Sequence, residues 1–226
     1  MVPSPKIPRT EIQPGLWLDA RRALFIEPLR ILVVADLHWG YVESHRARGN
    51  LLPHWGDAEI ATQLRSLIAD YEPREMIWLG DSLNAPTGRT AAEKFLDDLS
   101  TSNDPEIFIL AGNHDHRWSR ANLRELQRPG FFFHHGDDTK LKAPTDVIEV
   151  IGHHHPAVSL HDGAGTRLKL PALVASSHRL ILPAFSPWSA GTNWLNYVEP
   201  KEFLWAIAPS RIFAVKPQRP GFDRGP

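Results

Sequence analysis

Three apolar runs end in the same way, and this pattern limits the fold more than any other feature of the sequence. Each run is rich in aliphatic residues and passes directly into Asp, His or Asn; the runs are RILVVADLH (30–38), EMIWLGD (75–81) and EIFILAGNHD (106–115). Short apolar runs of this kind predict buried strands. Ligands of open α/β sheets bind beyond the carboxyl ends of the strands, so we expect these polar residues to converge on one crevice.

The segments around these runs complete the predicted fold. Apolar residues at helical spacing predict helices at 56–71, 90–100 and 119–127. Further strands are expected as a pair within 16–27 and at 146–156, 167–176, 178–185, 203–209 and 211–217. Parallel βα units followed by a β-rich second half predict an α/β protein with two packed sheets and helices outside.

Length and composition are those of an ordinary globular protein. For 226 residues, 42 % of them hydrophobic, we expect one domain over 1–226 with irregular, Pro-rich tails at about 1–14 and 216–226. The net charge of −1 gives no overall attraction to nucleic acid. The sequence shows no signal-peptide pattern and no apolar run near the ~20 residues of a membrane span, so we expect a cytoplasmic protein without membrane association.

Two further segments add histidines where a predicted strand passes into a turn. FFFHHGD (131–137) contains His134 and His135, and DVIEVIGHHHP (146–156) contains three consecutive histidines. Side chains alternate in an extended segment, so His153 and His155 are expected on one face and His154 on the other. A surface histidine cluster is the alternative interpretation of such a triplet.

Together these strand ends predict a metal site. The chain has no cysteine, so an ion would bind to His, Asp, Asn, Glu or water, a set that suits Mn²⁺, Fe, Zn²⁺ or Ni²⁺. The candidates outnumber the ligands of one tetrahedral zinc. Two ions sharing a bridging carboxylate would clamp the attacking and leaving oxygens of a phosphoryl group, and Asp81 is the natural bridge.

The ordered blocks Asp-x-His, Gly-Asp, Gly-Asn-His-Asp, His-Gly and Gly-His-x-His, which span residues 36–155, resemble the motifs of the calcineurin-like metallophosphoesterase superfamily. The resemblance implies a four-layer α/β/β/α sandwich of the metallo-dependent phosphatase type and two divalent ions, with Mn²⁺ the first choice. One ion would be held by Asp36, His38, His155 and bridging Asp81. The other would be held by Asn113, His135, His153 and the same Asp81.

The same resemblance assigns a proton-transfer pair. His114 would lie outside the metal ligands and assist departure of the ester oxygen, and Asp115 would fix its tautomer. Lipid A precursor pyrophosphohydrolases share the Asp-Leu-His motif but typically have Arg where this chain has His114, which argues against that branch.

A narrower resemblance concerns two segments. ADLHWGYVESHRARGNLLP (35–53) and LILPAFSPWSAG (180–191) are similar to patterns of the ligase-associated DNA damage response endonucleases, the PdeM-like group. This implies a single-stranded DNA substrate and DNA-repair ligase or helicase partners. The sequence departs from the group at Tyr41, where Lys is expected, and in Ser186-Pro187-Trp188, which replaces Gly and an aromatic residue.

We therefore expect a two-metal phosphodiesterase, a DNA endonuclease linked to repair, in which a metal-bridging hydroxide attacks phosphorus in line. The alternatives are a phosphomonoesterase or pyrophosphohydrolase acting on a small metabolite, and a non-catalytic metal-bearing interaction module. Trp188 and Trp194 are candidates for base stacking, against ordinary packing as the alternative.

Arginines supply the candidate substrate contacts. The helix expected at 119–127 would align Arg120 and Arg124 with Arg117 and Arg128 in one basic stripe. Arg46 and Arg48 of the SHRARG turn (44–49) would join it. Such a stripe would track the phosphates that flank a scissile bond. The alternative is an ordinary solvated helix face.

Overall fold

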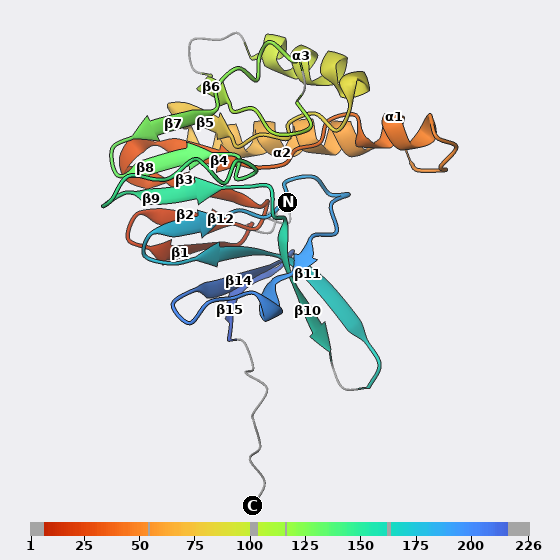
Figure 1. The fold of residues 1–226 in the computed structure, drawn as a ribbon. Helices are drawn as coiled ribbons and strands as arrows, with labels where there is room; N and C mark the ends of the chain where they lie inside the picture. The colour runs from red at the N-terminus through yellow and green to blue at the C-terminus, as the bar shows by residue number, and fades with distance from the viewer. Residues whose placement is uncertain (1–6, 54, 100–103, 116, 162–163, 217–226) are drawn as a thin grey trace, which may run out of the picture.

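The computed structural model describes residues 7–53, 55–99, 104–115, 117–161 and 164–216. Its first sheet has the strand order β1-β2-β3-β4-β5-β6 (Figure 1). The strands are β1 (Arg9–Gln13), β2 (Leu16–Asp19), β3 (Ala23–Ile26), β4 (Ile31–Val34), β5 (Glu75–Trp78) and β6 (Glu106–Ile109). Strands β4, β5 and β6 are parallel neighbours, so their carboxyl ends lie at one edge of the sheet.

The second sheet has the order β13-β10-β11-β12-β9-β8-β7, with β14 paired to β11 and β15 to β14. Its strands are β7 (Glu125–Arg128), β8 (Phe131–His134), β9 (Ile148–Ile151), β10 (Pro156–His161), β11 (Arg167–Ala175), β12 (Arg179–Ile181), β13 (Thr192–Asn193), β14 (Phe203–Ala208) and β15 (Arg211–Val215). Strands β8, β9 and β12 are parallel and central, which brings the ends of β8 and β9 together.

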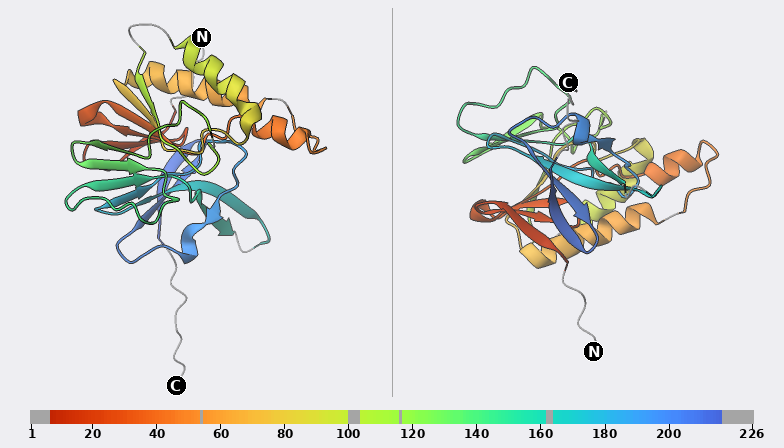
Figure 2. Two further views of the ribbon diagram at one scale, coloured as in Figure 1. Left: turned by 45° about the horizontal axis from the view of Figure 1, so that its top comes forward. Right: turned by 90° about the horizontal axis from the view of Figure 1, so that it is seen from below.

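Side chains alternate along each strand of the first sheet, so its two faces pack against different layers. Leu32 and Val34 of β4 pack with α2 (Gly56–Tyr71) and α3 (Arg89–Asp98), whereas Val33 packs with Phe133 and Val150 of the second sheet. Because successive side chains point to opposite faces, a strand buried on both faces must be apolar throughout. Figure 2 shows the resulting order of α2, first sheet and second sheet.

The outer face of the second sheet is covered differently. Its apolar cluster, which includes Val158 and Leu204, packs against Trp194 of the short 3₁₀ helix η3 (Trp194–Asn196). Within the described residues, η3 therefore stands where the four-layer arrangement has a helical layer. The predicted α/β fold with two packed sheets is confirmed. Several elements were not predicted, among them η1 (Glu27–Leu29), η2 (Pro86–Gly88) and α1 (Tyr41–Arg46).

Two predictions are wrong. The segment 119–127 is no helix, because β7 begins at Glu125 and pairs antiparallel with β8, and Leu123 forms a bridge to Leu110 of the first sheet. The hairpin that β7 forms with β8 across the turn at 129–130, together with the bridge to the first sheet, outweighs the local helical spacing. The N-terminal tail is shorter than 1–14, because β1 pairs with β2. The expected C-terminal tail lies outside the described residues apart from Lys216.

Candidate metal centre

Five loops meet where the strands end. Three leave β4, β5 and β6 of the first sheet, and two leave β8 and β9 of the second. The amide of His38 donates to the Asp81 carbonyl at 3.0 Å, and the amide of Gly152 donates to the His135 carbonyl at 3.0 Å. Between the sheets, the amide of His153 donates to the Asp36 carboxylate at 3.0 Å. The predicted convergence of the strand ends is therefore observed.

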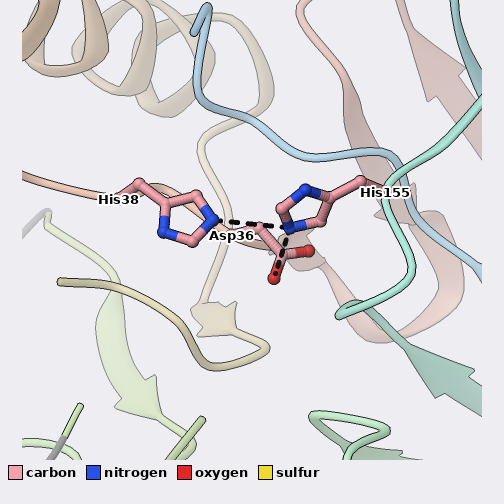
Figure 3. A group of neighbouring side chains, drawn as sticks. All are labelled: Asp36, His38 and His155. Atoms are coloured by element: carbon pink, nitrogen blue, oxygen red, sulfur yellow. Dashed lines mark hydrogen bonds and ion pairs between the residues drawn. The ribbon is translucent and has the colours of Figure 1, made fainter. Parts of the chain in front are cut away.

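The first ligand group consists of Asp36, His38 and His155 (Figure 3). The His155 Nε2 atom lies 3.3 Å from Asp36 Oδ1 and 3.4 Å from His38 Nε2. Asp36 and His38 come from the β4 loop and His155 from the β9 loop, so both sheets contribute. Asp36 and His38 are buried, whereas His155 is partly exposed.

The second ligand group consists of Asp81, His135 and His153. The His135 Nε2 atom lies 3.5 Å from Asp81 Oδ2 and 3.2 Å from His153 Nδ1. Asn113 Oδ1 lies 3.3 Å from the same nitrogen. The four side chains assigned to one ion thus surround a common point, with Asp81 and Asn113 from the first sheet and both histidines from the second.

The backbone of these residues is unusual. Five of the candidate ligands have positive φ: Asp36 (54°), His38 (53°), Asp81 (45°), His153 (64°) and His155 (44°). Left-handed backbone is unfavourable for residues with a Cβ, although Asp and His adopt it more readily than most. In the described part of the chain, half of the ten non-glycine residues with positive φ are therefore candidate ligands, and such strain is common where function requires a fixed geometry.

This backbone corrects the reason given for the GHHHP triplet. The segment is not extended: it leaves β9 as a bend, and the left-handed conformation directs His153 to the second group and His155 to the first. His154 contacts Trp194 instead, with ring centroids 5.6 Å apart. The division between two inward histidines and one outside the groups was predicted, but alternation along a strand does not produce it.

Electrostatics differ between the groups. Burial lowers the pKa of His38 to about 4, so this imidazole is neutral at pH 7. Burial acts in the same direction on His135, but the carboxylates of Asp81 and Asp36 outweigh it and raise the pKa of His135 to about 9. A place where two carboxylates stabilise a positive charge so strongly is a place that attracts a metal cation.

The donor atoms fit divalent ions. His135 Nδ1 donates to the Leu79 carbonyl at 2.7 Å, which leaves Nε2 as the ligand atom and is the usual way of orienting a metal-bound histidine. A metal–nitrogen bond of about 2.0–2.1 Å and bond angles near 100–110° separate two ligand nitrogens by about 3.2–3.4 Å. The imidazole pairs lie 3.2 and 3.4 Å apart. The residues therefore fit two ions, one in each group.

Two motif glycines make this packing feasible. A Cβ on Gly112 would lie 2.3 Å from Asp81 Oδ1, and a Cβ on Gly80, at φ +87°, would lie 2.6 Å from His135 Nδ1. Side chains at these positions would displace the two residues at the heart of the second ligand group. This is the physical reason for glycine in the Gly-Asp and Gly-Asn-His-Asp blocks.

His114 lies at the edge of the centre. Its Nε2 atom is 4.0 Å from Asp81 Oδ2, its ring centroid is 5.4 Å from that of His38, and 43 % of its side chain is exposed. Its Nδ1 atom donates to the carbonyl of Asn84 at 3.3 Å. This contact uses the backbone carbonyl of Asn84, and a backbone carbonyl has no signature in the sequence.

The predicted role of Asp115 is wrong. Its buried carboxylate accepts hydrogen bonds from the amides of Leu83, Gly112 and Ser82, at 2.8, 3.0 and 3.2 Å. Burial raises the pKa of Asp115 to about 6 in spite of these bonds. Asp115 therefore ties the β5 and β6 loops together, whereas the Asn84 carbonyl orients His114.

His134 is separated from the centre as predicted. Its Nε2 atom lies 3.0 Å from Glu149 Oε1, away from both ligand groups, whereas the next residue, His135, belongs to the second group.

Comparison with known proteins identifies the family. The family model described as calcineurin-like phosphoesterase matches residues 29–182, which is more than half of the chain. The chain belongs to the calcineurin-like phosphoesterase family. No curated protein matches it.

Two solved structures are similar to this chain, and the first of them supports the fold. Pseudomonas putida nuclease MPE has a TM-score of 0.70 and 23 % identity, over 93 % of this chain and 100 % of that one. Yfce, a phosphoesterase from E. coli, has a TM-score of 0.42 and 15 % identity, over 83 % of this chain and 99 % of that one. In the described part of this phosphoesterase, no helix is long and apolar enough to cross a membrane.

The arginines expected to contact substrate do not form one stripe in this calcineurin-like phosphoesterase. Arg120 pairs with Asp97 of α3 at 3.1 Å, and Arg124 pairs with Asp138 at 3.7 Å. Without a helix at 119–127, nothing aligns them. Arg124 still lies beside the site, because Arg124 and Asn113 both line a hollow of about 350 Å³. Arg46, at the end of α1, donates to the Leu52 carbonyl at 2.6 Å.

Proposed function

We propose that this protein is a metal-dependent phosphodiesterase that cleaves single-stranded DNA. The observation that carries the proposal is the pair of adjacent ligand groups with His114 at their exposed edge. When bound, two divalent ions would act as Lewis acids on the phosphoryl oxygens and lower the pKa of an attacking water. The two groups together contain only two carboxylates, so a loaded centre would keep a positive charge that favours an anionic substrate.

The chain itself supplies positioning and proton transfer. Because His114 Nδ1 donates to the Asn84 carbonyl, Nε2 is the atom that can deliver a proton to the leaving oxygen. Asp81 Oδ1 accepts the His114 amide at 2.8 Å, so the same carboxylate holds the second ligand group and the loop of the acid. Asp115 keeps the loops that carry Asp81 and Asn113 at a fixed separation.

The shape of the surface favours a diester over a monoester. Two hollows of about 350 Å³ each share Asn113: one is lined by Leu83, Pro86 and His114, and the other contains Arg117 and Arg124. A phosphodiester carries a group on each side of phosphorus, whereas a monoester carries one. In the second hollow Arg117 and Arg124, which share it with Asp137 and Asp138, are the candidate contacts of a flanking phosphate. The hollow beside His114 is suited to the departing sugar.

DNA is proposed as the substrate because this chain is similar in fold to a nuclease and in two segments to a group of DNA endonucleases. The fold resembles a nuclease, Pseudomonas putida MPE, and the ADLHWGY and LILPAF segments resemble the PdeM-like group. On the same basis we assign Mn²⁺ as the ion, a role in DNA repair with ligase or helicase partners, and a cytoplasmic location.

Turnover of two model esters tests the proposal. The protein is stripped with EDTA, reloaded with Mn²⁺ and assayed on bis-(p-nitrophenyl) phosphate and on p-nitrophenyl phosphate. We expect metal-dependent hydrolysis with the diester preferred. A preference for the monoester favours the phosphomonoesterase alternative, and a protein that binds two ions but hydrolyses neither ester is a non-catalytic module.

A further inference from the structure

Aromatic side chains gather beside the first ligand group. Tyr41 of α1 and Trp188 have parallel rings, within 3°, with centroids 6.1 Å apart. The Trp55 ring lies 5.0 Å from that of Trp188, and His45 stacks on Tyr41 at 4.3 Å. We call Tyr41, His45, Trp55 and Trp188 the aromatic shelf.

Backbone hydrogen bonds join the shelf to the metal centre. The amide of Tyr41 donates to the His38 carbonyl at 3.1 Å, and the amide of Ser186 donates to the Asp36 carbonyl at 3.2 Å. Trp188 follows two residues after Ser186 and donates its amide to the Ser186 hydroxyl at 3.4 Å. Two of the four rings are therefore carried by segments that are bonded to candidate ligands.

The shelf is not part of the core. Trp39 and Trp78 are fully buried between the first sheet and the helices, whereas Trp55 is 50 % exposed and the other shelf residues are half-buried. One edge of the Trp188 indole nevertheless packs closely on Gly56, where a Cβ would lie 2.3 Å from its Nε1 atom. Rigid aromatic rings that remain accessible beside a reaction centre are typical of ligand contacts.

We propose that the aromatic shelf stacks on a nucleobase next to the scissile phosphodiester of a single-stranded nucleic acid. This deepens the proposed function and rests on it. Every base has a flat face that stacks on aromatic side chains, and bases within a duplex are already stacked on one another, so the shelf selects unpaired strands. Tyr41 and Trp188 lie in the two segments that depart from the PdeM-like pattern, and the structure brings these departures together.

The basic residues nearby fit the same ligand. Arg46 and Arg48 follow the shelf residue His45 at the end of α1, and the hydrogen bond from Arg46 to the Leu52 carbonyl holds the turn that leads to Trp55. A strand whose base rests on the shelf would thus pass a positively charged turn with its phosphates.

Two oligomers separate base stacking from phosphate binding. One is oligothymidylate, and the other is an oligomer of the same length made of abasic tetrahydrofuran phosphates; both are assayed with the Mn²⁺-loaded protein. We expect the wild type to prefer oligothymidylate. Trp55→Ala should lower kcat/KM for oligothymidylate by roughly 10- to 100-fold, chiefly through KM, and leave cleavage of the abasic oligomer unchanged. Trp55→Phe, which keeps an aromatic face, should retain most of the preference.

Tyr197→Ala is the matched control, because Tyr197 is a 62 % exposed aromatic residue that contacts Trp194 and not the shelf. It should leave both oligomers unaffected. If Trp55→Ala lowers kcat/KM equally for both oligomers, or if the wild type shows no preference between them, the shelf proposal is wrong. If the wild type hydrolyses bis-(p-nitrophenyl) phosphate but neither oligomer, the shelf proposal and the DNA substrate both fail, whereas the phosphodiesterase activity stands. If it hydrolyses none of the three, the proposed function itself fails.

Discussion

The two ligand groups are built from the same kinds of side chain but lie in different electrostatic surroundings. Each has one aspartate from the first sheet, and each receives histidine from the second. In the first group His38 is held neutral by burial, with its pKa lowered to about 4. In the second group Asp81 and Asp36 overcome burial and raise the pKa of His135 to about 9.

This difference shows where the fold concentrates negative charge. Asp36 belongs to the first group, yet its Oδ1 atom lies 3.9 Å from His135 Nδ1 and its carboxylate accepts the amide of His153. Asp81 likewise binds the loop of His114. The second group therefore depends on both carboxylates, and damage to it should spread further than damage to the first.

The largest effect is expected from Asp81→Asn. The amide keeps the shape but removes the charge, so the centre loses attraction for a cation and the assigned bridge between the ions. We expect less than one ion per chain by elemental analysis and no measurable hydrolysis of bis-(p-nitrophenyl) phosphate. Asp97→Asn, at an exposed carboxylate that pairs with Arg120, is the control and should change neither quantity. Retention of two ions by Asp81→Asn would refute the bridging role.

The adjacent histidines His135 and His134 give the next comparison. His135→Ala should remove one ion and abolish turnover, because the second group loses its central nitrogen. His134→Ala should keep both ions and activity but lower the free energy of unfolding by about 1–3 kcal/mol, since a buried partner of Glu149 is lost. Metal content and urea unfolding distinguish the two. The reverse pattern of metal loss would show that the ligand is assigned to the wrong histidine.

His114→Ala separates proton transfer from metal binding. Its side chain lies outside both groups, so the variant should keep two ions while kcat falls by roughly 10²–10⁴-fold. A leaving group that needs no protonation should reduce the loss, so p-nitrophenyl esters should suffer less than oligothymidylate. Loss of metal equal to that of Asp81→Asn would contradict the role given to His114.

The strand ends that carry the site could be predicted from the sequence, whereas the segment 119–127 and the contacts of Asp115 could not. The ends of β4, β5 and β6 were predictable because an apolar run and its polar exit are adjacent in sequence. The segment 119–127 was not, because the spacing of Leu123 and Leu126 suits a helix as well as the strand that pairs with β8 across the turn at 129–130. The family resemblance assigned Asp115 a contact with His114, whereas the fold turns this carboxylate to the amides of Leu83, Gly112 and Ser82.

Backbone conformation was the other hidden feature. A glycine in a sequence marks a position that adopts positive φ easily. His153 and His155 also have positive φ, but nothing in the triplet of histidines indicates it. The prediction that only these two histidines point inward depended on a periodicity that does not apply here. Such conformations are set by the surrounding structure, which holds the ligands in place against a local preference.

The smallest expected effect measures this local preference in each ligand group. His155 in the first group has φ 44° and His153 in the second has φ 64°, so glycine at either position should relieve strain that alanine retains. Glycine also gains entropy in the unfolded chain, which offsets part of the relief. In EDTA we therefore expect the Gly variant to exceed the Ala variant in free energy of unfolding by roughly 0.5–1 kcal/mol at both positions.

His154 provides the matched control for these substitutions, because it lies between the two histidines but is not among the residues with positive φ. Here glycine relieves no left-handed strain, so His154→Gly should be less stable than His154→Ala by roughly 0.5–1 kcal/mol. Urea unfolding of the six variants gives the three differences directly. A sign change between His154 and its neighbours places the strain at the candidate ligands, and a larger gain at one neighbour identifies the more strained ligand group. The same sign at all three positions would show that the left-handed backbone carries no strain.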